Sequence, residues 1–335
     1  MEPWYSGLPK NYHLRMVAVD LSLCTAEECG LFVEAVARAP VRSVTVSNVA
    51  DDGCLQALYD AIRRHNVLHK VTVEDVHLGP ADVKVLPCYP ETSVVTLSSS
   101  HFPDVPALCG AIRELAVCRH ISSLRLRFDS YDESLYSATA DVMAILGPTV
   151  REVKLHAEDF YEADDENRVA CQNRLIKAVT SNRNLTRLKL HVAYLNAACC
   201  QFVADSVLNS WTLCELSLEA LEVPSCAMFL RCLIPGVARN HSLLVASLPD
   251  CGDKLGVEMA TLQDVAGRNV RFLALASRFV IHYRYGDPYG RDVLPLVAKH
   301  PNLVEMVARD GSVTETEAKS MVEGALQIVA PGPYA

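Results

Sequence analysis

The sequence Leu185-Thr-Arg-Leu188-Lys-Leu190 shows the pattern that organises the whole chain. An aliphatic residue is followed by two variable residues, a second aliphatic, one variable residue and a third aliphatic. Clear copies of this pattern begin at residues 41, 68, 121, 150 and 213, and weaker copies span residues 14–19, 92–97, 243–248, 270–275 and 303–308. The eleven copies recur about every 29 residues, a spacing typical of a repeat protein.

Each copy predicts a short β-strand, because alternating side chains point to opposite faces of a strand. The segments between copies predict amphipathic helices. Apolar residues at helical spacing occur there at Leu55, Leu58 and Ile62, and again at Leu175, Ile176 and Val179. One such repeat buries too little apolar surface to offset the entropy lost on ordering it. We therefore expect an α/β chain whose repeats fold by stacking on one another.

This pattern, with Asn66, Asn182 and Asn240 a few residues before a strand, resembles the leucine-rich repeat. The repeat length and the full helix are similar to the ribonuclease-inhibitor type, which also forms the repeat region of NOD-like receptors. The resemblance implies a horseshoe solenoid of about eleven strand–helix repeats, with a parallel concave sheet and helices on the convex side. The chain departs from the family after its strands, where the usual Asn or Cys is replaced by Val49, Val76, Glu158, Ala193 and Leu221.

The expected segments are a lead-in over residues 1–13, the solenoid over residues 14–330 and a tail over residues 331–335. The ends of a solenoid need a cover. Trp4, Tyr5 and Leu8 are candidates for that cover. The alternatives are that the chain is a fragment of a longer receptor or that its end dimerises. At the other end, Thr314-Glu-Thr-Glu317 predicts a capping box and a final helix.

The composition narrows the class of partner. Half of the 335 residues are apolar and 21% are charged, which is typical of a folded chain. A formal net charge of -9 argues against a nucleic-acid partner, because nucleic acids are bound by basic surfaces. The 13 cysteines are odd in number and irregularly spaced, so we expect reduced thiols and a cytoplasmic protein. No signal peptide and no apolar run of membrane-spanning length is found in the sequence.

The predicted concave face carries a group of basic residues. Side chains that flank the buried aliphatics of a strand point to the opposite face. In three successive copies these side chains are Arg125, Arg127, Lys154, His156, Arg187, Lys189 and His191. Like charges on adjacent strands repel one another, and Glu152 supplies one counter-charge. We therefore expect this face to bind an acidic patch of another protein. The alternatives are a phosphate-bearing ligand, or side chains that extend into water without a partner.

Two repeats contain insertions. The first, over residues 157–168, is acidic and is interpreted as a solvated loop, since it lacks the spacing and glycine of a calcium-binding EF-hand. The second, over residues 279–291, is aromatic and basic. Its Tyr283, Arg284 and Tyr285 are candidate partner-binding residues, because Tyr and Arg are favoured at binding hot spots. The alternative is that these aromatic side chains pack onto the solenoid.

The sequence contains no phosphate-binding GxxxxGK[ST] loop, no HExxH and no GxSxG motif. Cys109, Cys118 and His120 lie close in sequence without a CxxC pair, and Cys199-Cys200 is expected inside a helix. No metal and no cofactor are expected. We therefore expect a non-enzymatic protein-binding scaffold or ligand-sensing module.

Two other functions stay open. The repeat type and the repeat count are similar to those of one family of GTPase-activating proteins, although no matching Asn-Arg loop is present. A substrate adaptor of a ubiquitin ligase is the other alternative, and it requires a helical domain upstream of the repeats.

Overall fold

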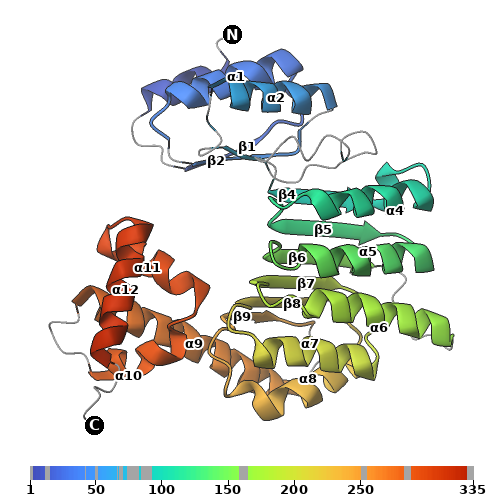
Figure 1. The fold of residues 1–335 in the computed structure, drawn as a ribbon, viewed down its shortest axis with the longest axis vertical. Coiled ribbons are helices and arrows are strands. Elements are labelled where there is room, and N and C mark those ends of the chain that lie inside the picture. Colours follow the sequence, from blue (N-terminus) through green and yellow to red (C-terminus); the bar gives the residue numbers. More distant parts are fainter. Residues whose placement is uncertain are drawn as a thin grey trace. The chain divides into compact units, whose positions relative to one another are not determined.

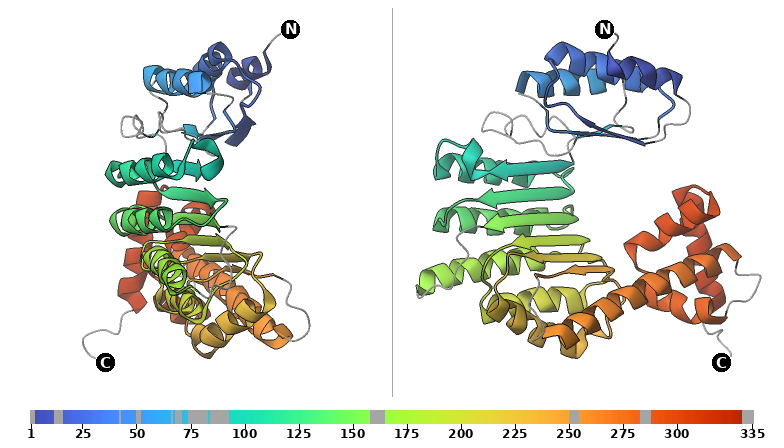
Figure 2. Two further views of the ribbon diagram at one scale, coloured as in Figure 1. Left: turned by 90° about the vertical axis from the view of Figure 1, so that its right-hand side faces the viewer. Right: turned by 180° about the vertical axis from the view of Figure 1, so that it is seen from behind.

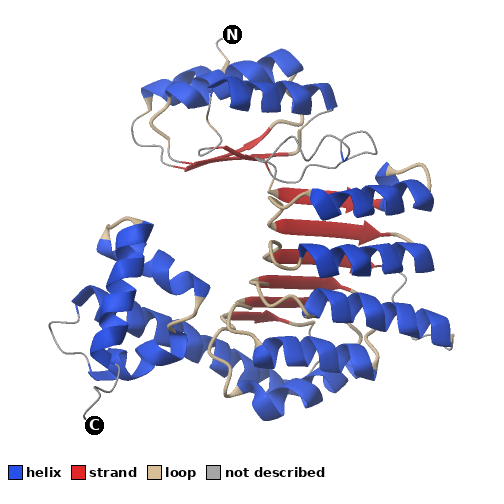
Figure 3. Cartoon of the chain, in the orientation of Figure 1, coloured by secondary structure: helices blue, strands red, loops and turns tan. Residues whose placement is uncertain are grey.

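The computed structural model shows an α/β chain. The described residues are 3–11, 16–41, 43–49, 52–65, 67, 71–73, 83, 93–157, 165–249, 255–282 and 288–329. The chain divides into two compact units, unit 1 (Met1–Ala157) and unit 2 (Glu158–Ala335). Strands alternate with helices along unit 1 and along unit 2 as far as residue 247 (Figures 1 and 3).

The first part of unit 1 is a three-stranded parallel sheet with two long helices. It consists of β1 (Met16–Asp20), α1 (Ala26–Arg38), β2 (Ser43–Ser47), α2 (Asp52–His65) and β3 (Val71–Val73). The short helix η1 (Trp4–Lys10) packs against α1, whereas no residue of β1 is buried. Its Tyr5 and Leu8 are buried, and the ring centroid of Trp4 lies 5.4 Å from that of Phe32 in α1.

The second part of unit 1 carries the candidate site. It consists of β4 (Val94–Ser98), η3 (Ser99–His101), α4 (Val105–Glu114), η4 (Leu115–Val117), β5 (Ser123–Phe128), α5 (Glu133–Leu146) and β6 (Glu152–Ala157). Helices α4 and α5 pack side by side on one face of these strands (Figure 2). Leu124, Leu126 and Phe128 of β5 are buried on that face, so the intervening Arg125 and Arg127 point to the opposite one. We call the face that carries Arg125 and Arg127 the open face.

Unit 2 begins with the same alternation of helices and strands. It consists first of α6 (Glu166–Thr180), β7 (Arg187–His191), α7 (Ala197–Asn209), β8 (Glu215–Glu219), α8 (Val223–Val237) and β9 (Val245–Ser247). Strand β8 pairs in parallel with β7 and with β9. Within unit 1, β5 pairs in parallel with β4 and with β6.

Hydrogen bonds from side chains link successive turns of unit 2. Before β9, the amide oxygen of Asn240 accepts from the backbone N–H groups of Ser242 and Leu243. The amide nitrogen of Asn240 donates to the carbonyl of Val207 in the preceding repeat, over 2.7 Å. Before β8, the Ser210 hydroxyl accepts two backbone N–H bonds in the same way. The turns are therefore supported at the ends where the strands begin, without an Asn or Cys after each strand.

The long helix α9 (Gly256–His282) follows the last of these hydrogen-bonded turns and bonds to it. Asn269 is fully buried, and its amide nitrogen donates to the carbonyls of Asn240 and Leu243 over 3.2 and 2.9 Å. The neighbouring Arg268 also donates to the carbonyl of Asn240. Helix α9 thus satisfies backbone carbonyls at the place where another repeat would follow.

The expectation of eleven strand–helix repeats is wrong for the last two copies of the pattern. The described residues contain nine strands, six in unit 1 and three in unit 2. Residues 270–275 lie inside α9, and residues 303–308 lie inside α11 (Pro301–Gly311). The aliphatic pattern also fits a helix there, because Leu303 and Val307 are both buried and lie four residues apart on one helical face.

The chain ends in a group of four helices with an apolar core of its own: α9, α10 (Pro288–Val297), α11 and α12 (Glu315–Val329). The predicted capping box is confirmed. The backbone N–H of Thr314 donates to Glu317 Oε2 over 2.8 Å, and the N–H of Glu317 donates to Thr314 Oγ1 over 3.3 Å. None of the helices in the described part of the chain is long and apolar enough to cross a membrane.

Candidate functional site

The structure brings four of the candidate basic residues together on the open face of unit 1. In the register of β5 and β6, Arg125 lies beside Lys154 and Arg127 lies beside His156. Adjacent strands of a sheet are about 4.8 Å apart, so these side chains leave the sheet close to one another. Arg127 and Lys154 are exposed, whereas Arg125 and His156 are half-buried.

These four side chains line a hollow of about 280 Å³. The other residues that line it are Thr96, Ser98, Ser100, His101 and Leu126. We call this feature the basic hollow. Three permanent cations, two imidazoles and three hydroxyls face it, and no carboxylate is found among its described lining residues. All of these residues belong to unit 1.

Thr96 contributes a buried hydroxyl to the lining of the basic hollow. The residue is 9% exposed, and its Oγ1 is buried without a partner among the described residues. Thr96 lies beside Arg125 in the register of β4 and β5. Leaving such a group unsatisfied costs about 1–3 kcal/mol. By contrast, the Ser98 and Ser100 hydroxyls bond to each other over 2.8 Å.

Among the described residues, two carboxylates lie near the basic hollow. Asp129 accepts a hydrogen bond from the Ser99 hydroxyl over 2.7 Å and one from Arg127 Nε over 3.0 Å. These two bonds hold the pKa of Asp129 below its ordinary value. Glu152 lies at the start of β6, beside Ser123. Counted over the described residues alone, two carboxylates beside three permanent cations give this surface a net positive charge.

The remaining basic candidates lie on β7 in unit 2, and their surroundings differ. Arg187 lies 3.3 Å from a carboxylate oxygen of Glu215. Lys189 Nζ lies 2.5 Å from one oxygen of Glu219, and His191 Nδ1 lies 3.3 Å from the other. The bonds from Lys189 and His191 hold the pKa of Glu219 below its ordinary value. The basic row of β7 is therefore largely neutralised by acidic side chains of β8.

Three candidates, Tyr283, Arg284 and Tyr285, lie outside the described residues, as does most of the acidic insertion, residues 158–164. Among the described strands, the basic hollow of unit 1 combines net positive charge with a shaped cavity.

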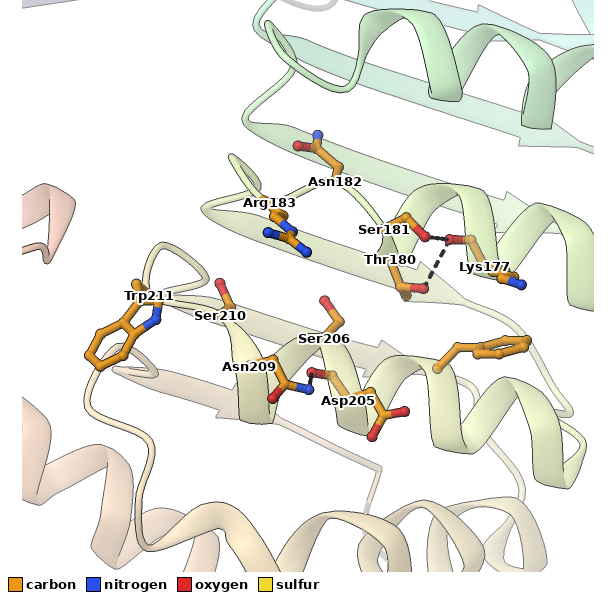
Figure 4. Close-up of a pocket in the computed structure, with 11 residues that line it drawn as sticks. Lys177, Thr180, Ser181, Asn182, Arg183, Asp205, Ser206, Asn209, Ser210 and Trp211 are labelled. Atoms are coloured by element: carbon orange, nitrogen blue, oxygen red, sulfur yellow. Dashed lines mark hydrogen bonds between the residues drawn. The ribbon is translucent and has the colours of Figure 1, made fainter.

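Unit 2 contains a larger hollow of about 590 Å³, between the ends of α6 and α7 (Figure 4). Three of its polar side chains bond to the backbone of their own helices. Thr180 Oγ1 donates to the carbonyl of Ile176 over 2.8 Å, and Ser181 Oγ donates to that of Lys177 over 2.6 Å. Likewise, the amide nitrogen of Asn209 donates to the carbonyl of Asp205. These groups terminate helices, so size alone does not make this hollow the better candidate.

The cysteines of the described residues are thiols, and most are buried. Cys199 and Cys200 lie inside α7, as predicted, and burial raises the pKa of each to about 12. A thiol with such a pKa is a poor nucleophile at neutral pH. Among the described residues, no three His, Cys, Asp or Glu side chains come together as a metal site would require.

Sequence reasoning missed the hydroxyls of the basic hollow. Alternation placed Thr96 and Ser98 on the same face as the basic residues, but their residue types gave no functional signal. Their importance follows from register and burial, since Thr96 lies beside Arg125 and its hydroxyl has no partner in the described structure. The acidic partners on β8 were also missed, although Glu219 occupies the strand position that matches His191.

A scan against models of known protein families returns no match for this chain, and a search of curated proteins returns none either. The residues of the basic hollow therefore carry the functional inference.

Proposed function

We propose that this chain is a leucine-rich-repeat protein of the ribonuclease-inhibitor type and acts as a non-enzymatic scaffold. We further propose that its basic hollow binds an acidic segment of another protein. The strand–helix alternation supports the repeat type. The basic hollow is the observation that supports the proposed binding role. Cations and hydroxyls of paired strands line this cavity, and no carboxylate is found among its described lining residues.

Electrostatics explains why this arrangement favours an acidic partner. Arg125 and Lys154 lie on adjacent strands, where like charges destabilise the sheet. A bound anion relieves that repulsion, so part of the binding free energy comes from the protein itself. Complementary charge of this kind governs which partner binds and how fast it associates.

The chemistry of the thiols supports a binding role in a reducing compartment. The described cysteines are thiols, and burial raises the pKa of Cys29 and Cys214 to about 12. Such side chains contribute apolar packing rather than nucleophilic chemistry. Persistent thiols are typical of cytoplasmic proteins, and we place this protein in the cytoplasm.

The test compares short peptides of equal length that are Glu-rich, neutral or Lys-rich. We expect the wild type to bind the Glu-rich peptide, with an affinity that falls as salt is raised. The double variant Arg125→Glu/Lys154→Glu should weaken this binding by about tenfold or more, because two charges of the site change sign. Biolayer interferometry measures each dissociation constant.

The matched control is Lys189→Glu, which changes the same residue type at the equivalent position of β7 and should leave peptide binding unchanged. Circular dichroism melting of all variants checks that they fold. Equal binding of neutral and Glu-rich peptides, or no loss in the double variant, would show that the basic hollow is not the site.

A further inference from the structure

The donors of the basic hollow match a phosphate group better than a carboxylate. Each polar side chain that lines it is a cation, an imidazole or a hydroxyl. A phosphomonoester carries a charge of about -1.5 to -2 and three strongly accepting oxygens. A carboxylate carries one charge and two oxygens. A cavity whose polar lining consists of cations, imidazoles and hydroxyls therefore matches the larger charge and the three oxygens of a phosphate better.

Thr96 is the most informative of these donors. Its hydroxyl is buried and has no partner within the described residues, yet it belongs to the lining of the cavity. Packing does not require the hydroxyl, because valine has nearly the same shape and no unsatisfied polar atom. A ligand oxygen in the basic hollow would accept a hydrogen bond from the Thr96 hydroxyl.

The volume limits the size of the ligand. About 280 Å³ lies just below the range of about 300–1,000 Å³ that small-molecule sites occupy. Leu126 is the one aliphatic residue among the described lining residues, so the cavity offers little apolar surface to a base or a ring. A single phosphorylated side chain fits these limits, whereas a nucleotide or a large cofactor does not.

We propose that the basic hollow binds the phosphoryl group of a phosphorylated side chain on a partner protein. This inference rests on the proposed function and names the acidic group that the partner presents. The formal net charge of -9 favours a protein over a nucleic acid or an anionic membrane, because the chain as a whole repels extended polyanions. One phosphate in a local basic cavity avoids most of that repulsion.

The test uses short Gly- and Ala-rich peptides that contain one phosphoserine, one aspartate or one serine at the same position. Titration calorimetry measures their binding to the full chain, and phosphorus NMR follows the phosphoserine resonance. We expect the phosphoserine peptide to bind about tenfold or more tightly than the aspartate peptide, since it gains both charge and hydrogen bonds. The serine peptide should not bind measurably.

Two variants separate binding from folding. Lys154→Met should weaken phosphoserine binding by about tenfold or more, whereas the matched Lys189→Met variant on β7 should leave it unchanged. Thr96→Val should weaken it by about tenfold, the loss expected for one hydrogen bond to a charged group. At the same time Thr96→Val should keep or raise the melting temperature, because it removes an unsatisfied buried hydroxyl. A fall in melting temperature without a change in affinity would assign Thr96 a structural role and overturn the proposal.

Other outcomes identify other ligands. Equal affinity for the aspartate and phosphoserine peptides overturns the phosphate inference, but leaves the proposed function intact if the Glu-rich peptide still binds. If inorganic phosphate binds as tightly as the phosphoserine peptide, the rest of the peptide contributes nothing to the affinity. Preferential binding to phosphatidylcholine vesicles that contain phosphatidylinositol 4-phosphate would identify a lipid headgroup instead.

Discussion

Two basic rows occupy equivalent strand positions in the two units, and their neighbours give them different properties. On β5 and β6 of unit 1, Arg125 lies beside Lys154, and both line a cavity. On β7 of unit 2, Lys189 and His191 share the carboxylate of Glu219 on β8. The basic residues alone are therefore a poor guide to a binding surface. The residues of the next strand decide whether the charge is available to a partner.

The largest expected effect comes from giving unit 1 the acidic neighbour that unit 2 has. In β6, position 156 lies beside Arg127, as Glu219 lies beside His191 in β8. We expect His156→Glu to weaken binding of the Glu-rich peptide by about tenfold or more, because a carboxylate then neutralises the row from within. Biolayer interferometry measures the change. His156→Gln, which removes the imidazole without adding charge, is the control and should have a much smaller effect.

A smaller effect is expected from the converse change, Glu219→Gln in unit 2. Replacing the carboxylate with an amide removes the negative charge that Lys189 and His191 now contact. We expect weak new binding of the Glu-rich peptide, several-fold poorer than at the basic hollow, because none of these three residues lines a described cavity. A variant that also carries Arg125→Glu/Lys154→Glu isolates this new site. No gain of binding would show that neighbouring carboxylates do not distinguish the two rows.

The same variant has a predictable effect on stability. Both side chains of the Lys189–Glu219 pair are more than a third exposed, so the pair contributes less than about 1 kcal/mol. The pKa of Glu219 is lower in the folded state, so its contribution is present at neutral pH and is lost as the pH falls through that lowered pKa. Urea unfolding should therefore show the wild type slightly more stable than Glu219→Gln at pH 7, with the difference vanishing in acid.

The smallest expected effect is at the turn after Glu219. Ala220 has a φ of 60°, a left-handed conformation that is unfavourable for alanine. We expect Ala220→Gly to stabilise the chain by roughly 0.5–1 kcal/mol, since glycine adopts this conformation without steric cost. Urea unfolding measures the change, and peptide binding should stay as in the wild type. A loss of stability would mean that the methyl group of Ala220 contributes packing that outweighs the strain.

The sequence predicted the repeated part of the fold because short strands alternate with amphipathic helices at a nearly constant spacing. It failed at residues 270–275 and 303–308, where the same aliphatic spacing occurs inside long helices. Six residues are too few to separate the two periods when the buried positions, such as Leu303 and Val307, also suit a helix.

The candidate site was predictable only in part. Residue type and alternation identified Arg125, Arg127, Lys154 and His156, and the structure places them together. The contribution of Thr96 depends on the burial of one oxygen atom, which no spacing rule reveals. The neutralisation of Lys189 depends on a diagonal contact between strands, because Ser217 rather than Glu219 lies beside it in register.

The way α9 ends the bonded turns has a consequence for how such a chain can change in length. Asn269 and Arg268 occupy the carbonyls of Asn240 and Leu243 that the turn of a further repeat would otherwise use. A duplicated repeat inserted before Asn240 would find the same partners on both sides. One added after β9 would have to displace two side chains and unpack a helix. Duplication can therefore add a repeat within the array, but α9 prevents the addition of a repeat after β9.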